Sequence, residues 1–226
     1  MRSAVQAFLN QDIPIAILPL GTFNLFAKEL GYPADIAGLF EIVKNNKVKL
    51  IDVAEVNNQI FLNHSTVGFY ARIMKMRQKH PKLLTKNKAL KILFNMSYFF
   101  NELPLYNVTL KSEDKEFAQK ICLLVVGNNA HSTDIINTGD PVSFAMGRLE
   151  VLVINCKTRW ELFKCVLMLI FFKTENNKYI SKFSCENLSV SRESKLINVV
   201  MDGDLFELES PLSYSINHKQ LSVFIP

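Results

Sequence analysis

Two acidic side chains flank a glycine near the end of the chain. The run Met201-Asp202-Gly203-Asp204 separates two apolar stretches that are typical of β-strands. Carboxylates at a strand end can hold Mg²⁺ or accept a hydroxyl proton during phosphoryl transfer, a reaction in which the protein mainly positions groups and stabilises charge. An Asp-Gly pair between strands is also an ordinary hairpin turn. Spacing alone favours the turn and leaves catalysis by Asp202 and Asp204 as the alternative.

A second polar turn follows an apolar run near the beginning. Residues 13–18 are continuously apolar, which is typical of a strand buried on both faces, and Gly21, Thr22 and Asn24 then precede a helical stretch that ends at Gly31. A strand that leads through such a turn into a helix presents backbone N–H groups to a phosphate. Thr22 or Asn24 could instead cap the helix, because the run is neither a P-loop nor G-x-G-x-x-G. Both interpretations stay open on spacing alone.

The pair His64-Ser65 suggests a nucleophile and its base, but its position on a strand argues against that. Adjacent residues of a strand point to opposite faces of the sheet, so the two side chains cannot meet. We therefore expect His64 to be structural or to line a site.

A basic interval, residues 75–91, precedes the aromatic run LKILFNMSYFF. Such a segment could rest on an anionic membrane, where each Lys or Arg adds about 1 kcal/mol. On this interpretation Lys86, Lys88 and Lys91 face the membrane. A solvated helix whose apolar side packs on the core explains the pattern equally well.

The elements that would position these groups differ between the two parts of the chain. Up to about residue 47, helix, strand and helix patterns indicate α/β structure. Beyond it, alternation around Asn57-Asn58 predicts a hairpin, and short strands at regular spacing predict a sandwich or flattened barrel. Individual predictions are helices at 2–10, 25–30, 34–44 and 159–172 and strands at 106–111 and 120–127.

Composition limits the functional classes. A chain of 226 residues with 49% hydrophobic content can bury a sizeable core, and a net charge of +5 suits a phosphate-bearing ligand or an anionic membrane surface. This charge is too weak and scattered to argue for nucleic acid as a partner. The four cysteines lack metal-ligand spacing, which favours reduced, buried thiols in a cytoplasmic protein. We see no signal peptide. The most apolar stretch, residues 162–172, is shorter than a bilayer span of roughly 20 residues.

Several runs of residues keep a characteristic order along the chain. They are ILPLGTFNLFAKELGYP, VKLIDVAEVNNQIFLNHSTVGFYARI, VGNN, GRLEVLVI and VVMDGDLFELESPLSYSINHKQLSVFIP. In order, spacing and flanking strands these runs resemble the catalytic region of the diacylglycerol kinase family, which includes bacterial lipid kinases and sphingosine kinases. The similarity covers essentially the whole chain and is greatest to the bacterial branch whose loop reads PLGT-x-N-x-F-A.

This resemblance implies an ATP-dependent kinase that phosphorylates a lipid hydroxyl, diacylglycerol-like or sphingoid, with ATP and Mg²⁺ as cofactors. It implies a fold like that of NAD kinase and diacylglycerol kinase, α/β plus all-β. Residues 1–48 would form part of an α/β nucleotide-binding domain, and residues 49–226 a β-sandwich lipid and catalytic domain with inserted helices. The active site would lie between them.

The resemblance also assigns roles to residues. Gly21, Thr22 and Asn24 stand where the family's Gly-Thr-x-Asn loop lines the nucleotide. Asp202 and Asp204 stand at its Asp-Gly-acid element, which approaches the phosphates, Mg²⁺ and the acceptor hydroxyl. Both are therefore candidate catalytic residues and metal ligands.

Three departures from the family pattern bear on activity. The glycine-rich GGDGT phosphate loop, which in the family precedes the helix at residues 2–10, is missing. Phe23 and Leu25 flank Asn24 where many relatives have Gly-Asn-Asp, and Met146 replaces an acid before the Gly of GRLEV. Losing one positioned acid or base costs roughly 10²- to 10⁴-fold in rate. We therefore expect the chain as written to be a truncated and inactive kinase.

Two other functional classes remain as alternatives. The first is a catalytically dead lipid- or membrane-binding module, and the second is a soluble NAD kinase-like enzyme, which the PLGT-x-N-x-F-A run and the aromatic stretch disfavour. The expected partners are a lipid substrate and an anionic membrane surface, with peripheral attachment to its inner face. A homo-dimer is left open.

Overall fold

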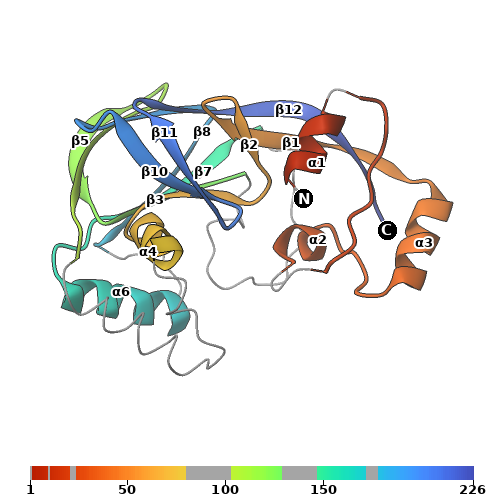
Figure 1. Cartoon of the computed structure of the whole chain (residues 1–226), viewed down its shortest axis with the longest axis horizontal. Coiled ribbons are helices and arrows are strands. Elements are labelled where there is room, and N and C mark those ends of the chain that lie inside the picture. Colours follow the sequence, from red (N-terminus) through yellow and green to blue (C-terminus); the bar gives the residue numbers. More distant parts are fainter. Residues whose placement is uncertain (1, 10, 21–23, 80–102, 129–146, 172–177) are drawn as a thin grey trace.

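A computed structural model of the chain describes residues 2–9, 11–20, 24–79, 103–128, 147–171 and 178–226 (Figure 1). In these ranges two six-stranded sheets, in which all neighbouring strands are antiparallel, form the bulk of the molecule. Short helices lie at both ends (Figure 1). The fold class expected from the sequence, helical α/β structure together with a β-sandwich, is confirmed.

The first sheet has the order β2-β1-β12-β9-β4-β5. Its strands are β1 (Val48–Val56), β2 (Gln59–Phe61), β4 (Tyr106–Lys111), β5 (Glu116–Ile121), β9 (Asn187–Ser191) and β12 (Leu212–Phe224). The expected hairpin joins β1 to β2. Asn57 and Asn58 both have positive φ, 47° and 64°, as a two-residue hairpin turn requires.

The second sheet has the order β11-β10-β3-β6-β7-β8. Its strands are β3 (His64–Gly68), β6 (Leu123–Gly127), β7 (Leu149–Ile154), β8 (Ile180–Cys185), β10 (Leu196–Met201) and β11 (Asp204–Glu209). The strand expected at residues 120–127 is divided at Cys122, because the chain there passes from β5 in the first sheet to β6 in the second.

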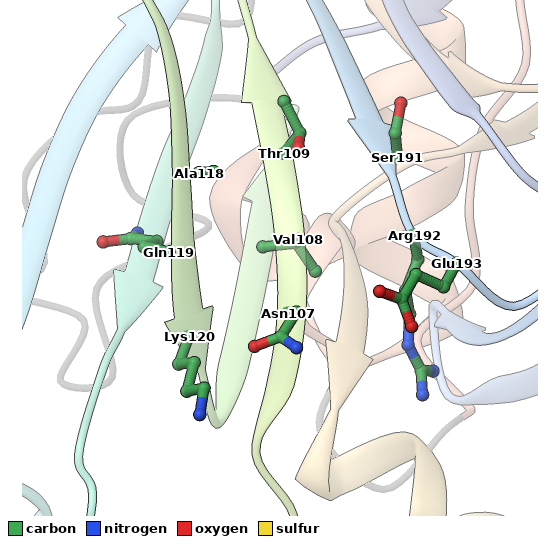
Figure 2. Close-up of a pocket in the computed structure, with 9 residues that line it drawn as sticks. All are labelled: Asn107, Val108, Thr109, Ala118, Gln119, Lys120, Ser191, Arg192 and Glu193. Carbon is green, nitrogen blue, oxygen red and sulfur yellow. The ribbon is translucent and has the colours of Figure 1, made fainter.

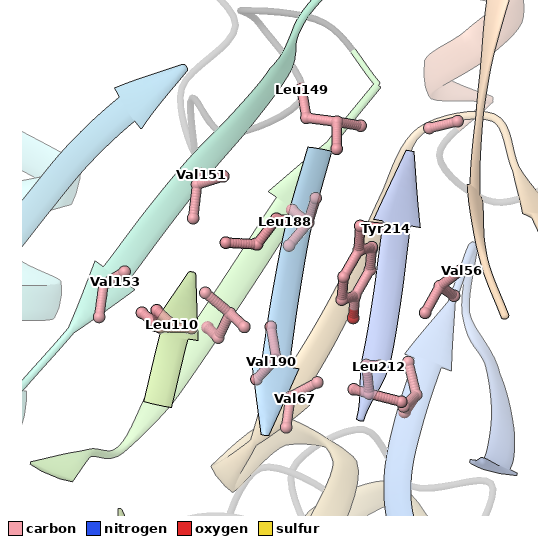
Figure 3. Close-up of a cluster of buried hydrophobic side chains, with 14 of the residues drawn as sticks. Val56, Val67, Leu110, Leu149, Val151, Val153, Leu188, Val190, Leu212 and Tyr214 are labelled. Carbon is pink, nitrogen blue, oxygen red and sulfur yellow. The ribbon is translucent and has the colours of Figure 1, made fainter. Parts of the chain in front are cut away.

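The main core lies between the two sheets. Alternate residues of each strand turn inward, as the period of two along a strand requires, so that Leu110 and Leu188 of the first sheet meet Val67 and Val151 of the second (Figure 3). Tyr214 is the largest fully buried side chain of this core, and its hydroxyl lies 3.0 Å from that of Ser65. The two hydroxyl groups thereby form a hydrogen bond inside the sandwich.

A second core lies at the far end of β1 and β12. Here α1 (Arg2–Phe8), α2 (Leu25–Glu29) and α3 (Ile36–Asn45) gather at the right of Figure 1, near the C-terminus. Ile51 and Val53 of β1 pack in this cluster, whereas Ala54 and Val56 pack in the main core. β1 and β12 thus connect the helical part to the sandwich.

The apolar run at residues 13–18 forms less regular structure than expected. It is extended, but it pairs with β12 through a single parallel bridge between Ile15 and Val223 instead of forming a strand. Pro14 and Pro19 lack the N–H groups that a longer ladder would need. The predicted division of the chain at residues 48 and 49 stays a prediction.

Two further helices cover the outer face of the second sheet. They are α4 (Phe69–Lys79), which contacts β3, β10 and β11, and α6 (Arg159–Phe171). Leu162 and Cys165 of α6 pack with Cys122 and Leu152 in a third apolar cluster. All four cysteines of the chain are buried free thiols. No helix in the described ranges is long and apolar enough to cross a membrane.

Candidate active site

Asp202 occupies the turn between β10 and β11. Its φ of 49° and that of Gly203, 94°, are both left-handed, which is the geometry of a two-residue hairpin turn. Both carboxylate oxygens face the loop between β2 and β3. They accept N–H groups of Leu62 and Asn63, each at 2.8 Å, and a longer one of His64 at 3.3 Å. The acidic side chain is therefore held in one position by backbone groups, while the same residue makes the turn.

Asn128 approaches the same loop from the end of β6. Its side-chain amide donates to the carbonyl oxygens of Asp52 and Leu62, both at 3.1 Å, and its backbone N–H donates to the carbonyl of Asn63. The residue is only 3% exposed. Asp202 and Asn128 therefore hold residues 62–64 from the ends of β10 and β6, the two strands that flank β3.

Two buried amide oxygens near this loop, Oδ1 of Asn63 and Oδ1 of Asn128, have no hydrogen-bond partner in the described structure. Buried polar atoms are bonded in the large majority of cases, and an exception calls for an explanation such as a ligand or a water. These oxygens are acceptors that a hydroxyl group could use.

Asp52 lies opposite an irregularity in the β1–β12 ladder. Ile51 pairs with Leu221 and Val53 with Asn217, so three residues of β12 stand opposite Asp52 alone. Its carboxylate, 2% exposed, accepts the N–H of Lys219 at 2.8 Å and that of Gly147 at 2.9 Å. One buried carboxylate thereby joins β1, the bulge of β12 and the segment that leads into β7.

Gly147 has a left-handed backbone conformation and lies close to the ring of His218. Its φ is +66°, and a Cβ atom there would lie 2.5 Å from Cε1 of His218 in the β12 bulge. The backbone conformation therefore favours glycine in the GRLEV run, whereas the exposed ring of His218 could turn aside for a Cβ atom.

His64 and Ser65 face opposite sides of β3, as the sequence predicts. Ser65 is buried in the sandwich with Tyr214, whereas His64 is half-buried beside the turn of Asp202. Burial lowers the pKa of His64, and the nearby negative charge of Asp202 offsets this only in part. His64 therefore cannot act as the base of Ser65, because the two side chains face opposite sides of the strand.

The other site residues expected from the sequence are only partly described. Asp204 is exposed and pairs with Met201 at the start of β11. Asn24 precedes α2 with a φ of 51°, and its amide donates to the carbonyl of Pro19 instead of capping the helix. The remaining candidates lie outside the described residues: Gly21, Thr22, Lys86, Lys88, Lys91 and Met146.

The donor set fits a metal that is shared with a ligand better than a protein-bound metal. In the ranges that the structure covers, no three His, Cys, Asp or Glu side chains gather closely enough to hold an ion. Three N–H groups already occupy much of the acceptor capacity of Asp202, and Asp204 is exposed. Mg²⁺ commonly binds through one or two carboxylates together with substrate phosphates and water. Asp202 and Asp204 could supply the carboxylates.

Sequence reasoning missed the hydrogen bonds by which Asp52 and Asn128 hold neighbouring segments together. Asp52 is the single acid within the apolar stretch KLIDVA, and Asn128 follows directly after the apolar strand LLVVG. A charged residue inside a buried strand is a signal because it requires partners. The partners themselves come from segments that are distant in sequence, so only the fold reveals them.

A groove on the sandwich lies apart from these residues. It has a volume of ≈ 410 Å³ and runs over β4, β5 and β9 (Figure 2). Asn107, Lys120 and Arg192 line it, and none of Asp52, Asn128 or Asp202 does. We assign it no part in the chemistry.

Known proteins similar to this chain include members of a kinase family. Residues 1–56 match the family described as "Diacylglycerol kinase catalytic domain". An uncharacterized protein of Synechocystis is 25% identical over 97% of this chain and 51% of its own length. A "Probable lipid kinase YegS-like" protein of Pseudomonas fluorescens is 31% identical over 46% of this chain and 32% of its own length. The chain spans about half the length of the first of these relatives.

Solved structures show the same fold. The crystal structure of a protein described as a "putative diacylglycerol kinase" from Bacillus anthracis superposes with a TM-score of 0.68 at 23% identity, covering 94% of this chain and 69% of the other. A second structure from the same organism gives a TM-score of 0.64 at 20% identity, covering 94% and 67%. These structures show the fold, while the family match at residues 1–56 confirms the resemblance to the diacylglycerol kinase catalytic-domain family that the sequence motifs indicate.

Proposed function

We propose that this chain takes part in ATP-dependent phosphorylation of a lipid hydroxyl, with a diacylglycerol-like or sphingoid acceptor. The observation that supports this most is the convergence of Asp202 and Asn128 on residues 62–64, where a positioned carboxylate lies near two unpaired amide oxygens. The chain is also similar in sequence to a relative named "Probable lipid kinase YegS-like". A hydroxyl acceptor needs such groups, which orient it and take its proton.

Asp202 is the proposed proton acceptor for the lipid hydroxyl. Its carboxylate is fixed by backbone N–H groups, so its position does not depend on flexible side chains. Because catalytic groups must be held near the productive geometry, this rigidity favours Asp202 over the exposed Asp204 as the base. Asp204 is proposed to face the phosphates.

ATP and Mg²⁺ are the proposed co-substrate and cofactor. Gly21, Thr22 and Asn24 would line the nucleotide, and Asp202 with Asp204 would contact the metal that arrives with the phosphates. Mg²⁺ would neutralise charge on the transferred phosphoryl group. Since the 226 residues contain no Gly-Gly-Asp-Gly-Thr run, we propose that this stretch by itself binds ATP weakly and turns over slowly.

A chimera tests the chemistry without relying on weak ATP binding. The chain replaces the matching part of the Bacillus anthracis structural neighbour, and transfer from radiolabelled ATP to diacylglycerol or sphingosine in mixed micelles is measured beside the parent protein. We expect lipid phosphorylation that falls by roughly 10²-fold or more on Asp202→Asn. Asp114→Asn, at an exposed carboxylate outside the site, should leave the rate unchanged.

Each outcome bears on a separate part of the proposal. A folded chimera that transfers no phosphate, beside an active parent, would contradict the kinase function and favour a lipid-binding module. An Asp202→Asn chimera that retains its thermal unfolding midpoint and full activity would remove Asp202 from the chemistry. Rapid turnover by the 226-residue chain alone would support the kinase function and contradict its dependence on further residues.

A further inference from the structure

Two aromatic side chains of α6 are exposed together. Trp160 is 70% exposed and Phe163 44% exposed, although both are large apolar residues. Their rings form an edge-to-face pair with centroids 6.2 Å apart. The helix already buries its other side, because Leu162 and Cys165 pack on the second sheet. Neither aromatic residue belongs to the apolar cluster beneath the helix.

Basic residues surround the aromatic pair. Lys157, Arg159 and Lys164 are all exposed, and none forms an ion pair with another residue in the described ranges. The single acidic residue of α6, Glu161, accepts the N–H groups of Lys157 and Thr158 and so belongs to the helix cap. The exposed side of the first turns of α6 is consequently aromatic and positively charged.

This combination matches an anionic membrane surface. Tryptophan favours the boundary between headgroups and acyl chains, where its ring is buried and its N–H stays near water. Lys and Arg beside it are attracted to anionic headgroups. A protein partner would need a matching apolar surface with acidic residues around it, whereas a bilayer supplies both from the same molecules.

We propose that α6 is the element by which the chain docks on anionic lipid bilayers, with Trp160 and Phe163 entering the interface and the three basic residues contacting headgroups. A lipid kinase meets its acceptor at such a surface, and to this extent the inference rests on the proposed function. Binding itself requires no ATP, so it can be measured whether or not the chain transfers phosphate. Figure 1 shows α6 at the end of the molecule opposite α3.

The sequence offers a direct reporter, because Trp160 is the one tryptophan in the chain. Its emission is measured while vesicles of phosphatidylcholine, with or without phosphatidylglycerol, are added without ATP. With the anionic vesicles we expect a blue shift and quenching by brominated acyl chains, and weak binding to the neutral vesicles. Added salt should weaken the association because it screens the basic residues.

Variants with matched controls test whether vesicle binding depends on the exposed face of α6. Trp160→Ala should reduce co-sedimentation with anionic vesicles roughly tenfold. Phe40→Ala removes a side chain of α3 that is also 70% exposed and should have no effect. The double change Lys157→Glu with Arg159→Glu should reduce binding more than tenfold, while Lys47→Glu with Lys49→Glu, an equal change of charge elsewhere, should reduce it only slightly.

The charge reversal should not unfold the helix. Arg159 stands in the first turn of α6, where an acidic residue is more favourable than a basic one, and Glu161 keeps its capping role. Vesicle binding without a shift of tryptophan emission would overturn the proposal. The proposal would also fail if Lys47→Glu with Lys49→Glu reduced vesicle binding as much as Lys157→Glu with Arg159→Glu. If the face instead joins two copies of the chain, Trp160→Ala would convert a dimer to a monomer in sedimentation velocity and leave vesicle binding unchanged.

Discussion

At the scale of single residues, Asp52 illustrates how a buried charge is kept in a strand. Its oxygens accept the N–H groups of Lys219 and Gly147 at hydrogen-bond distance. Asp52→Ala would leave both donors without a partner, so we expect a loss of about 2–5 kcal/mol in the free energy of unfolding, measured in urea. Glu55→Gln on the same strand, where the carboxylate meets a serine hydroxyl, should cost less than about 1 kcal/mol. If both variants lost the same free energy of unfolding, the two hydrogen bonds of Asp52 would not be the cause of the destabilisation.

Tyr32 gives a prediction about alkaline pH. Burial raises the pKa of Tyr32 to about 12, and its hydroxyl donates to the carbonyl of Phe224 at 2.5 Å. An unfolded tyrosine loses its proton near pH 10. Between about pH 10 and 12 the unfolded chain therefore binds fewer protons than the folded one, and stability falls as the pH rises.

Tyr32→Phe should consequently change stability in two ways. At pH 7 it should cost about 1 kcal/mol through the lost hydrogen bond. Above pH 10 the variant should lose stability less steeply than the wild type, although burial also raises the pKa of Tyr214 and leaves a residual slope. Urea midpoints from pH 8 to 11 measure this, with Tyr70→Phe at an exposed position as the control. An unchanged slope would contradict the role of Tyr32.

At the scale of elements, the β12 bulge and the segment before β7 depend on each other. Gly147→Ala places a Cβ atom against the ring of His218 and also strains a positive φ. Gly203→Ala shares the strain, at a φ of +94°, but its Cβ would meet no atom within 4 Å. We expect Gly147→Ala to destabilise the chain by up to about 1 kcal/mol more than Gly203→Ala in chemical unfolding, because the exposed ring of His218 must turn aside from the new Cβ atom.

A second substitution isolates the contact. His218→Ala combined with Gly147→Ala should recover much of the difference, because the clash disappears and the backbone strain remains. If the double variant is no more stable than Gly147→Ala, contact with the His218 ring is not the cause.

At the scale of the whole molecule, β1 and β12 run through two cores. Ile51 packs with the helices at one end, and Leu110 packs inside the sandwich. We expect Ile51→Ala and Leu110→Ala each to cost about 2–5 kcal/mol. Both should shift the unfolding followed by Trp160 emission and by circular dichroism to the same extent, as in a single cooperative unit. A Trp160 transition that does not respond to Ile51→Ala would show that the helical end unfolds separately.

Much of the fold followed from local patterns. The hairpin at Asn57-Asn58, the strand Tyr106–Lys111 and the helix Arg159–Phe171 were all predicted, because turn residues, alternation and apolar spacing are properties of short segments. The run at residues 13–18 was predicted less well, since pairing depends on a partner strand and on the prolines. The division of the chain at Cys122 between two sheets was likewise not visible in the sequence.

The sequence by itself determined the family resemblance and the identity of the carboxylates at Asp202 and Asp204. It could not determine that Asp202 makes a turn and at the same time binds residues 62–64, or that Asn128 holds the same loop. It also could not determine that Asp52 joins β1 to the β12 bulge and to Gly147. Nor could it show that Trp160 is exposed while Leu162 is buried. Hydrogen bonds between residues far apart in the sequence, and the choice of which helix face meets a sheet, arise only when the chain is folded, because both depend on the three-dimensional packing of the strands.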